Sequence, residues 1–291
     1  MMSQRRIPWA PYLFLLPFAV VFLTFTAYPL VQSLVLSAQQ TFGPRSARFV
    51  GAENFRFLLA DPLFWKALRN TTVFAAGSVF IQLPCALGLA ILLNRPTLKG
   101  RAFFRLIFFS PSLVGLVFVA MIFSLIFEKR TGLLNVTLNR TIGFNPDFPW
   151  LQEYVMPAMI IASVWMYVGF NMIYFLAALQ NVSRELLEAA EVDGANAWHK
   201  FRHITIPAIR PVATFVVLLS LIGSFQLFEL PFVLLGGGGP DNQGLTVVMY
   251  LYQMGFETGD LGYASAIGWV LAVLLGVFAI SQRFLSKAED A

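Results

Sequence analysis

Charged residues are scarce in this chain of 291 residues: they make up 12% of it, whereas about 25% is usual for a soluble domain. Hydrophobic residues make up 58%, and 30 residues are phenylalanine. A packed water-soluble core does not need so much apolar surface, so much of it is expected to face lipid. The single cysteine, Cys85, excludes an intramolecular disulfide framework, and we expect it to be a small buried side chain.

Several motifs of enzyme active sites are also absent from the sequence. It contains no GxxxxGK[ST] phosphate-binding loop, no GxSxG nucleophile elbow and no HExxH zinc helix. The two histidines, His199 and His203, are four residues apart and could share a helix face, but they stand among basic residues and we interpret them as part of a basic surface. We therefore expect no catalytic residue, no metal site and no cofactor in this chain.

Long charge-free stretches predict about six membrane helices, since a spanning helix needs about 20 mostly apolar residues. Helices are favoured over a barrel because lipid offers no partner for a free backbone amide, and because the alternating pattern of barrel strands is missing. We thus expect an all-α membrane protein with a single transmembrane domain over residues 1–291. Its predicted helices are 12–37, 70–94, 105–127, 154–180, 208–234 and 261–283.

The distribution of Lys and Arg predicts how the chain is oriented. With the N-terminus in the cytoplasm, the cytoplasmic loops hold more basic residues than the outer loops, as is usual for membrane proteins. Six crossings then predict that both termini are cytoplasmic.

The segment between the fourth and fifth predicted helices, residues 181–207, carries the strongest functional signal. Ser183 is a suitable N-cap, Glu185 suits the positive end of a helix dipole, and Gly194 is typical of a helix C-terminus. The short helix so predicted is acidic, and basic residues follow it. It could lie on the membrane surface, but anionic lipid would repel its acidic half, so we favour a protein partner.

A motif in this segment resembles the EAA loop of ABC importer permeases. Glu188-Ala189-Ala190, Gly194 and Ile204-Thr205-Ile206-Pro207 stand at the spacing E-A-A-x3-G-x9-I-x-L-P, with Ile206 in place of leucine. Other stretches along nearly the whole chain resemble the carbohydrate-uptake branch of these permeases, similar to the maltose and glycerol-3-phosphate permease subunits. They include Asn54-Phe55, Asn70-Thr71 and residues 105–111, 132–135, 237–240 and 261–265.

The resemblance implies a type I ABC importer-like fold with a cytoplasmic coupling helix. The chain would be the permease subunit of an ATP-driven, binding-protein-dependent importer in a bacterial or archaeal cytoplasmic (inner) membrane, translocating a sugar or a related polyol or sugar phosphate. Its expected partners are a second permease subunit in a heterodimer, two cytoplasmic ATP-binding subunits that hydrolyse ATP, and an extracytoplasmic solute-binding protein, with no nucleic acid. Coupling to the ATPase would be carried by Glu188, Ala189, Ala190, Gly194 and Pro207.

Glu229 is the one acid within a predicted apolar span, and an ionisable residue there is a functional candidate because it is costly in lipid. Gln226, three residues earlier, would share its helix face. Glu229 could instead pair with a neighbouring subunit or a helix end, and the other candidates could serve packing. The candidate sugar-binding residues are Gln226, Glu229 and Phe225 from the fifth helix, and Asn171, Tyr174 and Trp165 from the fourth.

A secondary carrier for a small polar solute is the main alternative function. Such a carrier needs no ATPase, and it is expected to show inverted repeats with paired broken helices. The sequence shows no clear repeat of this kind, and a secondary carrier would leave the motif in residues 181–207 unexplained.

Overall fold

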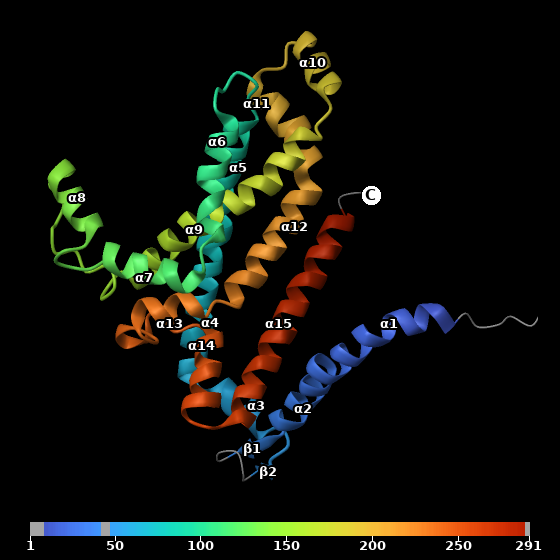
Figure 1. Cartoon of the computed structure of the whole chain (residues 1–291), viewed down its shortest axis with the longest axis vertical. Coiled ribbons are helices and arrows are strands. Elements are labelled where there is room, and N and C mark those ends of the chain that lie inside the picture. The colour runs from blue at the N-terminus through green and yellow to red at the C-terminus, as the bar shows by residue number, and fades with distance from the viewer. Residues whose placement is uncertain (1–8, 42–46, 289–291) are drawn as a thin grey trace, which may run out of the picture. The chain divides into compact units, whose positions relative to one another are not determined.

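The structure, a computed structural model, describes residues 9–41 and 47–288 (Figure 1). Its contacts group into two compact units, and the single transmembrane domain over residues 1–291 stays a prediction. One unit consists of the described part of Met1–Asp61 together with Leu251–Val270, and the other of Pro62–Tyr250 with the described part of Leu271–Ala291.

Apolar helices of membrane-spanning length dominate both units, which confirms the prediction of an all-α membrane protein with about six spans. A sixth span is present if the bent pair Arg101–Leu113 and Leu116–Ile126 is one broken span. Among the described residues, the five helices that qualify alone are Pro11–Ser37, Pro62–Asn94, Val155–Gln180, Ala197–Phe225 and Leu261–Gln282.

Two of the predicted helices are interrupted. Residues 105–127 are divided by a bend of 99°, because Pro111 lacks an amide donor and Gly115 has an extended backbone. Residues 208–234 are divided at 226–228, between α12 (Ile206–Phe225) and α13 (Glu229–Leu235).

The smaller unit is held together by polar contacts near the start of α15. The Thr41 hydroxyl donates to Asp260 at 3.3 Å and accepts the Gly262 amide at 3.1 Å. The Tyr263 hydroxyl donates to the Asp61 carboxylate at 2.6 Å. The elements of this unit are α1 (Trp9–Phe22), η1 (Leu23–Ala27), α2 (Tyr28–Ser37), the antiparallel pair β1 (Gln39–Thr41) and β2 (Ala47–Phe49), α3 (Glu53–Ala60), η6 (Gln253–Glu257), and parts of α14 (Val247–Tyr252) and α15 (Leu261–Ala288).

The larger unit contains the remaining helices and both interrupted ones. In chain order its elements are α4 (Pro62–Gly77), η2 (Ser78–Gln82), α5 (Leu83–Asn94), α6 (Arg101–Phe109), η3 (Ser110–Leu113), α7 (Leu116–Ile126), α8 (Leu133–Ile142), α9 (Val155–Gln180), α10 (Arg184–Val192), α11 (Ala197–Lys200), η4 (Phe201–Thr205), α12, α13, η5 (Pro240–Asn242), and the remaining parts of α14 and α15.

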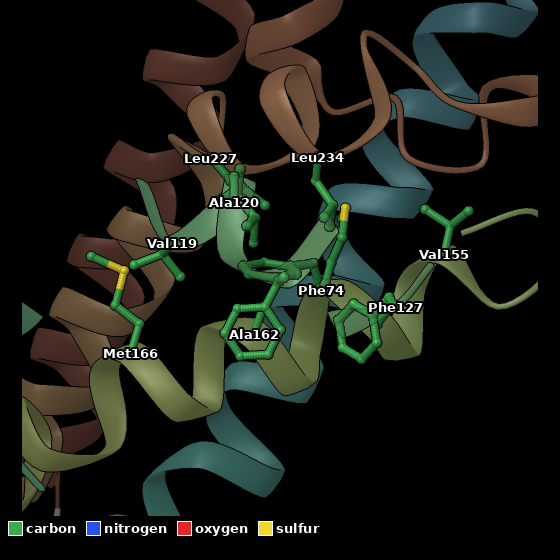
Figure 2. Packing of buried hydrophobic residues seen from close by; sticks show 13 residues of the cluster. Phe74, Val119, Ala120, Phe127, Val155, Ala162, Met166, Leu227 and Leu234 are labelled. Atoms are coloured by element: carbon green, nitrogen blue, oxygen red, sulfur yellow. The ribbon is translucent and has the colours of Figure 1, made fainter. Parts of the chain in front are cut away.

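Close packing stabilises the larger unit, since lipid tails provide no hydrophobic force that drives one helix onto another. In Figure 2, Phe74, Val119, Phe127 and Leu227 meet in one buried cluster. Elsewhere α6 and α9 touch backbone to backbone, because a Cβ at Gly169 would lie 1.8 Å from the Phe108 carbonyl oxygen. The prediction that Cys85 is buried is wrong, because its side chain is exposed.

Candidate functional site

A cavity of about 310 Å³ lies in the larger unit, among η2, α9, α12 and the link between α12 and α13. Aromatic side chains from three segments, α4, α9 and the link, line it: Phe74, Tyr167, Phe170 and Phe228. The polar lining includes side-chain amides, hydroxyls and one carboxylate, contributed by Ser78, Gln82, Ser163, Asn171, Gln226 and Glu229.

Several of these polar groups are left open for a ligand. The Ser163 hydroxyl donates to the Gln82 side-chain oxygen at 3.1 Å, so this buried pair is satisfied. By contrast, within the described part of the chain, the side chains of Asn171, Gln226 and Glu229 form no hydrogen bond with protein. Asn171 is only 6% exposed, whereas Gln226 and Glu229 are exposed where they line the cavity. A solute rich in hydroxyl groups would supply the partners that these side chains lack.

The break between α12 and α13 brings Gln226 and Glu229 to the cavity. The helix ends at Phe225, and Phe228 takes a non-helical backbone (φ −133°, ψ −56°) before Glu229 starts the next helix. The prediction that Gln226 and Glu229 lie on one face of one helix is therefore wrong. Both nevertheless line the cavity.

Hydrogen bonds from distant residues hold this break in place. The buried Thr246 hydroxyl donates to the Leu227 carbonyl at 2.7 Å and accepts the Met249 amide at 3.3 Å. Since Leu227 is itself buried, its carbonyl would otherwise be an unpaired acceptor at the end of α12. The link is thus a fixed part of the cavity wall.

Residues Asn70 and Thr71 of α4 in turn position Thr246. The Asn70 amide donates to the carbonyls of Asn242 and Leu245 at 2.9 and 3.1 Å. The Thr71 hydroxyl accepts the backbone amide of residue 247 at 3.1 Å. The family resemblance includes Asn70-Thr71, and the structure supplies a physical reason for both side chains.

The other three candidate sugar-binding residues do not line the cavity. Phe225 is 2% exposed and packs on Phe278, with 5.6 Å between ring centroids. Trp165 packs on Phe123 on a different face of α9. Tyr174 packs against Phe170, one turn further along α9 than the cavity.

Sequence reasoning missed the lining residues Ser78, Gln82 and Ser163. A usable signal is present, because polar residues inside apolar helices recur at helical spacing. Ser78 and Gln82 are four residues apart, and Ser163 stands four and eight residues before Tyr167 and Asn171, so each set shares a helix face.

The second candidate site is α10, which is capped at both ends. The Ser183 hydroxyl accepts the Leu186 amide at 3.4 Å, as expected for an N-cap. At the other end Gly194 has a left-handed backbone with φ +80°, and the Ala195 amide bonds to the Ala190 carbonyl at 2.8 Å. A Cβ at position 194 would meet no atom within 4 Å, so the backbone angle alone requires glycine there.

α10 has no buried residue, and Figure 1 shows it beyond the ends of α5 and α6. Three large apolar side chains are exposed in and next to it: Leu186 (59%), Val192 (88%) and Trp198 (64%). Glu188 and Ala189 are also exposed and Ala190 is half-buried, whereas Pro207 lies apart in the first turn of α12. The exposed apolar and acidic side chains make α10 a candidate docking surface.

An ion pair connects α10 with α11. The Lys200 ammonium group donates to the Glu191 carboxylate at 2.8 Å. This hydrogen bond, together with the positive charge of Lys200, lowers the pKa of Glu191 below its usual value. The Asn196 side chain caps α11 by accepting the His199 amide at 2.9 Å. This cap and the ion pair together define the shape of the loop between α10 and α11.

Known proteins resemble this chain along nearly its whole length. The model of the family described as "Binding-protein-dependent transport system inner membrane component" matches residues 82–289. The arabinooligosaccharide-transport permease AraP of Halalkalibacterium halodurans is 39% identical, over 98% of this chain and 89% of that protein. The lactose-transport permease LacF of Rhizobium radiobacter is 35% identical, over 95% and 93%.

A solved structure has the same fold. A chain of the bacterial alginate ABC transporter, crystallised with an alginate pentasaccharide-bound periplasmic protein, superimposes with a TM-score of 0.84 at 25% sequence identity. The similarity covers 96% of this chain and 94% of that chain.

Proposed function

This chain belongs to the family of binding-protein-dependent transport system inner membrane components, and we propose that its cavity is a carbohydrate site on the import pathway. As a family member it is a multi-pass permease subunit of an ABC importer and not an enzyme. Three observations support a carbohydrate as the solute. The similar proteins include permeases named for arabinooligosaccharides and lactose, the cavity offers aromatic faces for the C–H groups of a sugar, and its unpaired polar groups suit sugar hydroxyls.

The same proposal assigns α10 as the coupling helix that docks on a separate ATP-binding subunit. The observation that carries this assignment is the isolated, fully capped α10 with exposed apolar side chains at its surface. Docking uses Glu188, Ala189, Ala190 and Gly194, with Pro207 beginning the helix that receives the motion. A rigid helix transmits movement of the ATPase to the membrane helices as a rigid-body change.

The assembly that follows has two permease subunits, this chain and a different second one. Each docks on one of two cytoplasmic ATP-binding subunits, and a solute-binding protein delivers the carbohydrate from outside. α10 then faces the cytoplasm, and both termini lie on that side, in agreement with the distribution of basic residues. A secondary carrier would leave both α10 and the family membership without explanation.

Substitution of Gly194 by Asp tests the docking assignment. We expect Gly194→Asp to abolish carbohydrate uptake and binding-protein-stimulated ATP hydrolysis in the assembled importer, while the protein still inserts into the membrane. Aspartate strains a left-handed backbone position and adds charge to the docking surface.

Gly143→Asp is the matched control, since Gly143 also ends a helix with φ +67° and a Cβ there would meet no atom within 4 Å. It introduces the same strain and charge at the end of α8, so uptake should be retained. Normal coupling in Gly194→Asp, or equal loss in both variants, would refute the assignment of α10.

A further inference from the structure

We propose that this cavity admits uncharged sugars and rejects sugar acids and sugar phosphates, with the carboxylate of Glu229 as the charge filter. The inference rests on the proposed function, because it takes the cavity to be a carbohydrate site. It goes further by naming the charge class of the solute and the residue that sets it.

The charges of the lining residues carry this inference. No Lys, Arg or His is among the described residues that line the cavity, and Glu229 is the one Asp or Glu among them. Carboxylates and phosphates are bound in proteins by Arg, Lys or clustered backbone amides, since an anion needs positive charge to replace its water. The side-chain amides of Asn171 and Gln226 suit hydroxyl groups and provide no such charge.

The similar proteins do not decide the charge of the solute. Lactose is an uncharged sugar, whereas alginate is described as an acidic polysaccharide. Both charge classes are therefore transported by similar proteins. The charge class of the solute of this chain has to be inferred from the residues that line its cavity.

Glu229 is held where its charge acts on the cavity. The buried side chains of Leu227 and Leu230 flank it in sequence and are 7% and 1% exposed, so the backbone at Glu229 is fixed on both sides. The helix dipole of α13 favours an acid in its first turn. The Glu229 side chain is exposed and lines the same cavity as Phe228 and Leu219, so an anion that enters the cavity meets its negative charge and is repelled.

The first experiment measures the charge of the cavity without any sugar. Ser220, which lines the cavity, is replaced by Cys in a Cys85→Ser background, and the assembled importer is labelled with a cationic or an anionic methanethiosulfonate reagent. The quantity compared is the ratio of the cationic to the anionic labelling rate. We expect this ratio to be about tenfold higher at Ser220→Cys than at Thr137→Cys on α8, outside the cavity. Glu229→Gln should remove this preference at Ser220→Cys and leave the ratio at Thr137→Cys unchanged.

The second experiment uses two matched sugars, α-1,4-galactobiose and digalacturonate, which differ in the oxidation of the C6 hydroxymethyl groups to carboxylates. Protection of Ser220→Cys from the uncharged reagent N-ethylmaleimide reports occupancy of the cavity. Galactobiose should slow labelling severalfold, and digalacturonate should not. In Glu229→Gln, digalacturonate should protect measurably but less than galactobiose, because the repulsion is gone while the cavity still offers no positive charge.

The two experiments separate failure of the charge filter from failure of the proposed sugar site. Equal protection by both sugars with Glu229 present would overturn the charge filter. Equal labelling by the two thiosulfonates would also overturn it. That result would follow, for instance, if the second permease subunit brought a cation near Glu229. If neither sugar protects in either variant while the thiosulfonate preference is present, the sugar site is refuted, and with it the selection of uncharged sugars.

Discussion

Removal of the Thr246 hydroxyl should loosen the cavity wall that carries Gln226 and Glu229. In Thr246→Val the side chain keeps its shape, but the Leu227 carbonyl loses a donor at 2.7 Å and the Met249 amide loses an acceptor at 3.3 Å. Thr246 is 0% exposed, so water does not replace the lost bonds. Each unsatisfied group costs about 1–3 kcal/mol, and we expect the local opening free energy to fall by about 3 kcal/mol.

Hydrogen exchange measures this loss directly. Amide exchange reports the free energy of local opening, and about 3 kcal/mol corresponds to roughly a hundredfold faster exchange. The effect should be confined to residues 226–235 and 245–250. The affinity for a neutral sugar should fall in parallel, because the open link no longer presents Gln226 and Glu229 together.

Thr72→Val is the control, because it is the same substitution at an exposed site of α4. The Thr72 hydroxyl bonds to the carbonyl of Leu68, which lies in the same helix. Its exchange should match that of the unsubstituted chain. Exchange in Thr246→Val within threefold of this control would show that the hydroxyl does not hold the break, and the account of the cavity wall would be wrong.

Three further outcomes are expected. Gly169→Ala should prevent stable folding, because a Cβ there would lie 1.8 Å from the backbone of α6. Gly88→Ala is the control, because a Cβ there meets no atom within 4 Å. The yield of folded protein in detergent should fall for the first variant and stay unchanged for the second. Asn171→Ala should raise the apparent KM for sugar uptake severalfold with little change in thermal stability; Phe225→Ala should mainly lower the melting temperature, because its ring packs on a neighbouring helix. Since the pKa of Glu191 is lowered, the effect of its ion pair is present above the ordinary carboxyl pKa of 4.5 and lost as pH falls through the lower folded value. The ratio of ATP hydrolysis by Glu191→Gln to that by the unsubstituted complex should therefore be constant from about pH 6 to about pH 8, and a change within this range would contradict the lowered pKa.

Local signals made α10 and most spans predictable from the sequence. Ser183 and Gly194 are caps whose effect depends on residues nearby, and a charge-free stretch of about 20 residues is sufficient to predict a membrane helix. The break at residues 226–228 was not predictable in this way, because its stabilising donor, Thr246, lies 19 residues away.

This contrast between local signals and distant contacts also explains why only three of the six candidate sugar-binding residues line the cavity. Asn171 and Glu229 stood out as polar residues in apolar stretches, and both line it. Phe225 and Trp165 are candidates by residue type, but the orientation of a side chain around a helix depends on where that helix ends and what it packs against. The packing partners of both, Phe278 and Phe123, lie on other helices.

The series of contacts from Asn70 and Thr71 through Thr246 to Leu227 also constrains how the solute is released. These bonds join α4 to the segment that bears Gln226 and Glu229, so a tilt of α4 carries that segment along. Under the proposed function, we therefore expect the backbone that bears Gln226 and Glu229 to move as one piece during a transport cycle. We expect the solute to be released when this wall moves away from it as a whole, and not when single side chains of the wall rotate.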